Sequence, residues 1–198
     1  MTLPLLPGRM YHLYNHANGD ESLFREDDNY RYFLHKYVEH ISPIAETYAY
    51  CLMPNHFHFF VRMEDKEVLM NKYQDVVKAE NRLADFISGK WSNFFNAYTK
   101  AFNKKYDRKG NLFQQNFKRR MVDNDRYAQT LLGYIHLNPV KHGFCKSILD
   151  WPYSSVQGYY LDKKTRLNRK FSPTSLGDRE ALVNFHASIK IEESVFDW

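Results

Sequence analysis

Residues 48–61, YAYCLMPNHFHFFV, decide the fold because they contain two strand-like runs joined by a two-residue connection. Aromatic and apolar residues of this kind favour buried strands, and Pro54-Asn55 is typical of a tight turn. The sequence therefore predicts an antiparallel hairpin with strands at 44–53 and 56–63. Side chains alternate between the faces of a strand, so His56 and His58 point to one side and Phe57 to the other.

The flanking segments extend this hairpin into a mixed domain. In chain order the hydrophobic patterns predict a strand at 10–18, a helix at 25–42, the hairpin, helix from 66 to about 104 with a break at Gly89-Lys90, a turn at 107–111, a strand at 112–123 and a helix at 125–138. This order is that of a ferredoxin-like fold. We therefore expect an α+β protein, a ferredoxin-like α/β sandwich whose antiparallel sheet has the histidine strand at its centre and helices on one face.

Composition indicates a globular protein with an aromatic core. The chain has 198 residues, of which 43% are hydrophobic and 17% aromatic. Its two cysteines, Cys51 and Cys145, cannot form a disulfide framework, which favours a reducing compartment. Apolar runs fall short of the ~18 residues of a membrane span, and prolines interrupt the start of the chain where a signal peptide would be apolar. We expect a cytoplasmic protein without a membrane partner.

Positive charge is concentrated in one segment. The net charge is +5, and residues 99–126 hold nine Lys or Arg against three Asp or Glu. Cations neutralise phosphates, and interleaved aromatic and amide side chains contact bases, so this segment favours nucleic-acid binding. A solvated helix face followed by a basic loop would give the same composition.

Two groups of residues suggest a site for phosphodiester chemistry. Two neutral imidazoles, His56 and His58, can share a cation, although two hydrogen-bonded core histidines would show the same pattern. In the predicted helix 125–138, Tyr134 and Asn138 are four residues apart and share one face. Tyr134 as a core residue and Asn138 as a helix end would also explain that spacing. Together, imidazoles, an amide oxygen and a phenol beside a basic segment suit a divalent ion that acts on phosphate.

Three separated blocks resemble the REP-associated tyrosine transposases, a branch of the single-tyrosine HUH transposases. They are YAYCLMPNHFHFFV, then GNLFQQNFKRRMV, then LLGYIHLNPVKHGFC with DWPYSSV, and the resemblance covers about residues 10–160. It implies that His56 and His58 are metal ligands, that Tyr134 is the catalytic nucleophile and that the metal is Mg²⁺ or Mn²⁺. It also places Asn138 where related enzymes have the third ligand, often a longer Gln.

The resemblance further implies an enzyme that nicks single-stranded DNA and transfers strands through a 5′-phosphotyrosine link, acting on hairpin or repeat DNA. We expect residues 1–160 to form this domain and 161–198 an appendage. The protein would associate with the nucleoid, as a mobile or a domesticated transposase, and a homodimer is possible in this family. The expected DNA contacts are Tyr98, Lys104, Lys105, Arg108, Lys109, Lys118, Arg119 and Arg120.

Two other functions remain open from the sequence. The chain could be a ferredoxin-like module that binds nucleic acid without catalysis, with Phe59 and Phe113 as stacking residues, but His56 and His58 would then have no role. It could also be a hydrolase that uses activated water and forms no covalent link to DNA.

Overall fold

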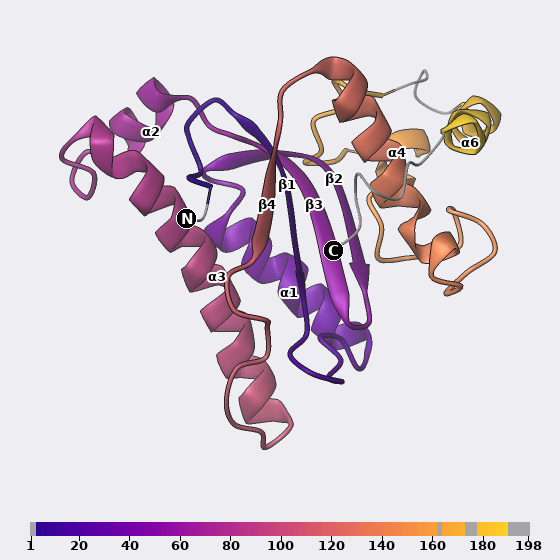
Figure 1. The fold of residues 1–198 in the computed structure, drawn as a ribbon, viewed down its shortest axis with the longest axis horizontal. Helices are drawn as coiled ribbons and strands as arrows, with labels where there is room; N and C mark the ends of the chain where they lie inside the picture. The colour runs from indigo at the N-terminus through magenta and orange to yellow at the C-terminus, as the bar shows by residue number, and fades with distance from the viewer. Residues whose placement is uncertain (1–2, 162–163, 173–177, 190–198) are drawn as a thin grey trace.

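A four-stranded antiparallel sheet forms the centre of the molecule (Figure 1). A computed structural model describes residues 3–161, 164–172 and 178–189. In spatial order the strands are β2 (Ala45–Met53), β3 (His56–Met63), β1 (Met10–His16) and β4 (Lys118–Val122). The histidine strand β3 therefore lies inside the sheet, paired with β2 on one side and β1 on the other. This confirms the predicted fold class and the predicted hairpin.

Helices cover both faces of the sheet (Figure 1). In chain order they are α1 (Asp27–His40), α2 (Lys66–Tyr73), the short 3₁₀ helix η1 (Glu80–Arg82), α3 (Leu83–Lys105), α4 (Asp125–Lys141), α5 (Gln157–Tyr160) and α6 (Arg179–Ser188). The two long helices α1 and α3 share one face, as the ferredoxin-like plan requires. The expectation of helices on one face needs a correction for α4, which packs on β2 and β3 from the other side. That side also carries apolar residues, such as Ala49 and Phe60, which must be covered.

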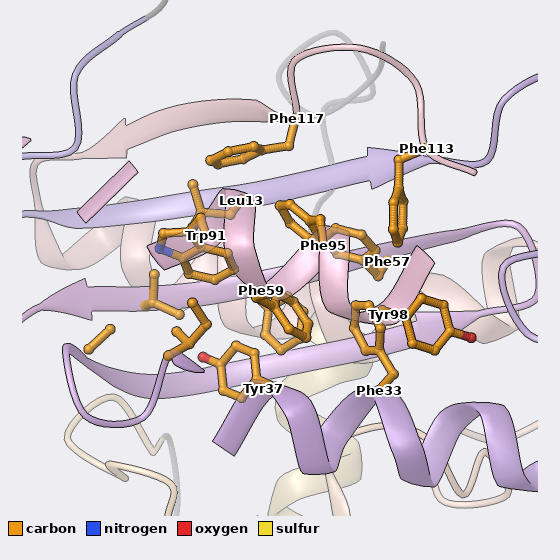
Figure 2. Close-up of a cluster of buried hydrophobic side chains, with 14 of the residues drawn as sticks. Leu13, Phe33, Tyr37, Phe57, Phe59, Trp91, Phe95, Tyr98, Phe113 and Phe117 are labelled. Atoms are coloured by element: carbon orange, nitrogen blue, oxygen red, sulfur yellow. The ribbon is translucent and has the colours of Figure 1, made fainter. Parts of the chain in front are cut away.

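The larger core lies between the sheet and the helices α1 and α3 (Figure 2). Phe57 and Phe59 point into it from β3, Tyr37 comes from α1 and Trp91 from α3. Phe59 stacks on Tyr37, with ring centroids 4.4 Å apart and an interplanar angle of 2°. Because this face of β3 is filled by aromatic rings, the histidines between them must point to the opposite face.

Three predicted boundaries differ most from the structure. The helical segment breaks at residues 74–79, between α2 and η1, and not at Gly89-Lys90. Gly89 lies inside α3, because one glycine in a helix interior lowers the helix stability by only about 1 kcal/mol relative to alanine. Helix α4 continues through Pro139 to Lys141, because a proline this near the helix end removes a single backbone hydrogen bond. Strand β4 is shorter than predicted, since Asn116 has a φ of 60° that no regular strand accommodates.

The described part of the predicted appendage packs on the α4 side of the sheet. Phe171 lies against Tyr48 and Phe60, with ring centroids 5.0 and 5.6 Å apart, and α6 contacts α4. Residues 162–163, 173–177 and 190–198 lie outside the described residues. The division at residue 160 therefore stays a prediction. No helix in the described part of the chain is both long and apolar enough to cross a membrane.

Candidate active site

Histidines from two neighbouring strands meet on the α4 face of the sheet. The register of β1 and β3 places His16 opposite His56 and Tyr14 opposite His58. The rings of His16 and His56 stack at 4.5 Å with an angle of 11°. His12 reaches His58 diagonally, with its Nε2 2.9 Å from His58 Nδ1. No role was predicted for His12 or His16, although their alternation in YHLYNH, residues 11–16, was a visible signal.

Helix α4 and the residue that follows it add side chains to the histidines of β1 and β3. Tyr134, Asn138 and His142 follow one another at four-residue spacing, so they share a helix face. The Tyr134 ring lies 5.5 Å from that of His58, and the His142 ring lies 4.8 Å from that of His56. Asn138 occupies the turn between these two contacts. The structure thus joins the predicted nucleophile to the histidine strand and adds His142, for which no role was predicted.

Local sequence fixes the position of α4. Its N-cap is Asn124, whose side-chain oxygen accepts a hydrogen bond from Tyr127 N at 2.8 Å. Leu131 and Ile135 are fully buried in the core between α4 and the sheet. Cap and apolar face together direct Tyr134, which is 2% exposed, toward β3.

Burial keeps the imidazoles of His12, His56 and His58 neutral. Desolvation, with a smaller contribution from the charge of Arg120, lowers the pKa of His12 to about 3. Desolvation lowers the pKa of His56 to about 2, helped by His16 and His142, and it lowers the pKa of His58 well below its ordinary value. A neutral imidazole is the form that binds a metal ion, so no proton has to be removed first.

The predicted metal ligands, His56, His58 and Asn138, are two imidazoles and a carboxamide. The Asn138 amide nitrogen donates to the carbonyl oxygen of Tyr134 at 2.9 Å, so the oxygen is the end of the amide that this bond does not use. The amide oxygen is a donor that suits Mg²⁺ or Mn²⁺, and imidazole nitrogens bind first-row divalent ions. Among the described residues, no group of three or more His, Cys, Asp or Glu side chains is arranged to hold a metal ion. The predicted ligands His56, His58 and Asn138 do not form a group of this kind, because Asn138 contributes a carboxamide.

Strand β4 presents two of the predicted DNA contacts on the histidine face. Lys118 pairs with Tyr14 and Arg120 pairs with His12, so both side chains share the face of those residues. Both are exposed. Arg119 points to the opposite face, where its guanidinium lies 4.2 Å from the centre of the Phe117 ring.

The other predicted DNA contacts are distributed differently. Tyr98 is 1% exposed and its hydroxyl donates to Leu23 O at 2.5 Å, so it is a core residue, which corrects its predicted surface role. Lys105 forms an ion pair with Glu26 at 2.5 Å. Arg108 donates to Glu21 Oε1 at 3.1 Å. Lys104 and Lys109 are exposed at the end of α3 and in the turn that follows.

Comparison with known proteins shows which proteins this chain is similar to. No protein-family model matches the chain. A candidate REP-associated tyrosine transposase of Haemophilus influenzae is 30% identical over 125 residues, which cover 62% of this chain and 63% of that protein. The REP-associated tyrosine transposase of Escherichia coli is 26% identical over 110 residues, which cover 56% and 53%. This chain is a homologue of the REP-associated tyrosine transposases.

A solved structure supports the fold of this REP-associated tyrosine transposase homologue. It is a REP-associated tyrosine transposase bound to a REP hairpin, and it aligns with a TM-score of 0.61 at 18% identity over 89% of this chain and 98% of that chain. The resemblance found in the sequence is thereby confirmed. The chain spans less than two thirds of the length of either curated relative it matches.

Proposed function

We propose that this protein nicks single-stranded DNA and rejoins strands through a covalent 5′-phosphotyrosine at Tyr134. The observation that carries the proposal is the convergence of Tyr134 from α4 with His58 from β3, at 5.5 Å between ring centroids. His56, His58, Tyr134 and Asn138 all belong to one chain, so the proposal does not require a second copy. A homodimer stays a prediction.

The chain's own residues define the reaction. The Tyr134 Oη–phosphorus bond forms as the bond from phosphorus to the 3′-oxygen breaks, and the 3′-oxygen takes up a proton. The pKa of a free phenol is about 10, so the hydroxyl proton must leave as the oxygen attacks. His56, His58 and Asn138 would hold Mg²⁺ or Mn²⁺, which would neutralise negative charge on the reacting phosphate. Attack by a 3′-hydroxyl on the phosphotyrosine reverses the first step and rejoins DNA without ATP, because one ester bond replaces another.

Hairpin or repeat DNA is the substrate that we propose. One relative is named as bound to a REP hairpin. Lys118 and Arg120 extend the histidine face toward the β4 edge with positive charge. Contacts of this kind to the phosphate backbone fix the position of a strand without reading its sequence. The shape of the DNA and the geometry of the site would then select the phosphate that is cut.

The Tyr134→Phe variant tests the proposal. We expect wild-type protein, incubated with Mn²⁺ and a single-stranded hairpin oligonucleotide, to give a nicked product and a protein–DNA adduct that survives denaturing electrophoresis. The phenylalanine variant should keep the fold, as judged by circular dichroism, and lose both products, because no other group replaces the phenolic oxygen.

Other results would support one of the rival functions. Nicking at the wild-type rate by Tyr134→Phe, or nicking by the wild type without any adduct, would identify a hydrolase that uses water. A His56→Ala, His58→Ala double variant with unchanged DNA affinity, together with a wild type that never nicks, would identify a binding module.

A further inference from the structure

Both candidate ligand histidines have their Nδ1 atom in a short hydrogen bond with a residue that has no assigned role. His56 Nδ1 lies 2.7 Å from Asn55 Oδ1. His58 Nδ1 lies 2.9 Å from His12 Nε2. His12, His56 and His58 are each at most 1% exposed, so the bond between His12 and His58 is buried, whereas the bond from His56 to the exposed Asn55 is partly buried.

We propose that Asn55 and His12 are positioning residues that hold the Nδ1 protons of His56 and His58 and so direct Nε2 of each ring to a divalent cation. The proposal rests on the function proposed above, because it concerns the same site. It assigns a purpose to two residues that neither bind the cation nor react with DNA.

Asn55 determines the tautomer of His56 by simple donor and acceptor chemistry. An amide oxygen only accepts hydrogen bonds, so His56 Nδ1 must carry the proton. A neutral imidazole has one N–H, which leaves the lone pair on Nε2. Asn55 is held by its backbone as well, because its carbonyl oxygen accepts from Ala17 N at 2.7 Å. The turn between β2 and β3 therefore presets His56 before any cation binds.

His12 and His58 form a pair with two possible proton arrangements. If the shared proton belongs to His58 Nδ1, the lone pair of His58 is on Nε2 and can bind a cation. If it belongs to His12 Nε2, His58 carries its proton on Nε2 and cannot bind a cation. The strand register keeps the two rings nearly parallel, at 5.1 Å and 17°. A cation at His58 Nε2 selects the first arrangement, with His12 as the acceptor.

A purely structural role would give different results from a positioning role. Buried ring nitrogens need hydrogen-bond partners in any protein, so loss of Asn55 or His12 would lower stability in either case. Only in a positioning role does the hydrogen-bond partner of His56 or His58 determine the tautomer of that histidine and the affinity of the protein for the cation. Variants that keep an acceptor at the same place, Asn55→Asp and His12→Gln, should then restore what Asn55→Ala and His12→Leu lose.

The experiment combines two measurements on folded protein. Long-range ¹H–¹⁵N NMR of the metal-free protein identifies the protonated nitrogen of His56, and calorimetric titration with Mn²⁺ gives the Kd. We expect the proton of His56 on Nδ1 in the wild type, and a Kd weakened about 10- to 100-fold in Asn55→Ala and His12→Leu. Asn55→Asp and His12→Gln should bind Mn²⁺ with wild-type affinity. His35→Leu, which removes an exposed histidine of α1, is the matched control.

Two results would overturn the proposal while leaving the proposed function intact. One is an NMR spectrum that places the proton of His56 on Nε2 in the wild-type protein. This measurement does not depend on the folding of any variant. The other is wild-type Mn²⁺ affinity in folded Asn55→Ala and His12→Leu. A wild-type protein that binds no Mn²⁺ would instead overturn the metal-dependent function and the roles of Asn55 and His12 with it.

Discussion

Phe59 and His58 are neighbours in the chain with opposite surroundings. The ring of Phe59 lies among Tyr37, Phe33 and Trp91 on the α1–α3 side, and His58 contacts Tyr134 on the α4 side. One face of β3 thus supplies much of the hydrophobic stability, and the other carries the candidate chemistry. Substitutions on the two faces should have separable effects.

Replacement of Phe59 by Ala should destabilise the protein strongly. Phe59 is fully buried, so the substitution leaves a cavity among rings that cannot collapse, at a cost of about 3–5 kcal/mol. Urea unfolding followed by circular dichroism measures this change. Val76→Ala, at a side chain 69% exposed, is the control and should change stability by less than about 0.5 kcal/mol. Similar unfolding midpoints for the two variants would contradict the assigned core.

Helix α4 is held from two sides, by the sheet and by α6. The contact with α6 includes a hydrogen-bond chain: His186 Nδ1 donates to Leu182 O at 2.6 Å, His136 Nδ1 donates to His186 Nε2 at 3.0 Å, and Ser155 Oγ donates to His136 Nε2 at 2.8 Å. Gly133 makes the close approach possible, since a Cβ there would lie 1.7 Å from Ile189 Cδ1. The helix that carries Tyr134 is therefore positioned partly by α6.

The His186→Leu variant should loosen α6 before the rest of the fold. It leaves the buried Nδ1–H of His136 without its acceptor, which costs about 1–3 kcal/mol. Hydrogen exchange followed by mass spectrometry should show faster exchange in residues 179–188, because local opening exposes that element first. Val183→Ala, an exposed substitution on α6, is the control. Unchanged protection in His186→Leu would show that the histidine chain does not hold α6.

Strand β4 should contribute positive charge to DNA binding through one face only. Removal of a phosphate contact reduces the steepness of log K against log salt by about 0.7 for single-stranded DNA. We therefore expect Lys118→Ala and Arg120→Ala each to lower this slope in fluorescence anisotropy titrations with a single-stranded oligonucleotide. Lys36→Ala on α1, on the opposite face of the sheet, should leave it unchanged. Equal slopes in all three variants would remove β4 from the proposed DNA surface.

At the scale of the whole molecule, buried neutral histidines make stability depend on pH. In the unfolded chain a histidine has a pKa of about 6.5, whereas burial lowers the folded pKa of His12 to about 3 and of His56 to about 2. His58, His136 and His186 shift in the same direction for the same reason. Below about pH 6.5 the unfolded chain therefore binds more protons than the folded protein.

The contribution of these histidines to the free energy of unfolding is fully present above about pH 6.5. It should fall as the pH drops toward their pKa values in the folded protein. Each such histidine contributes a slope of up to about 1.4 kcal/mol per pH unit. Urea unfolding at about pH 7.5 and pH 5.5 measures the effect before carboxylates begin to titrate. Equal free energies of unfolding at the two pH values would show that these histidines are charged or exposed in the folded protein.

Much of the fold and part of the site followed from local patterns. The Pro54-Asn55 turn and the alternation of Phe57 and His58 depend on neighbours within a few residues, so the sequence alone predicted them. The burial of Tyr98 could not be predicted this way. Its helical spacing places it on one face of α3, but only the packing of α1 against α3 makes that face interior.

The sequence by itself determined that two imidazoles share a strand face, that a tyrosine and an asparagine share a helix face, and that three motifs in this order resemble one transposase family. Only the tertiary structure decided that those two faces meet, that His12, His16 and His142 join them, and that α4 covers the side of the sheet opposite α1 and α3. The reason is physical: periodicity fixes the direction of a side chain relative to its own element, whereas register and packing between distant elements fix what it touches.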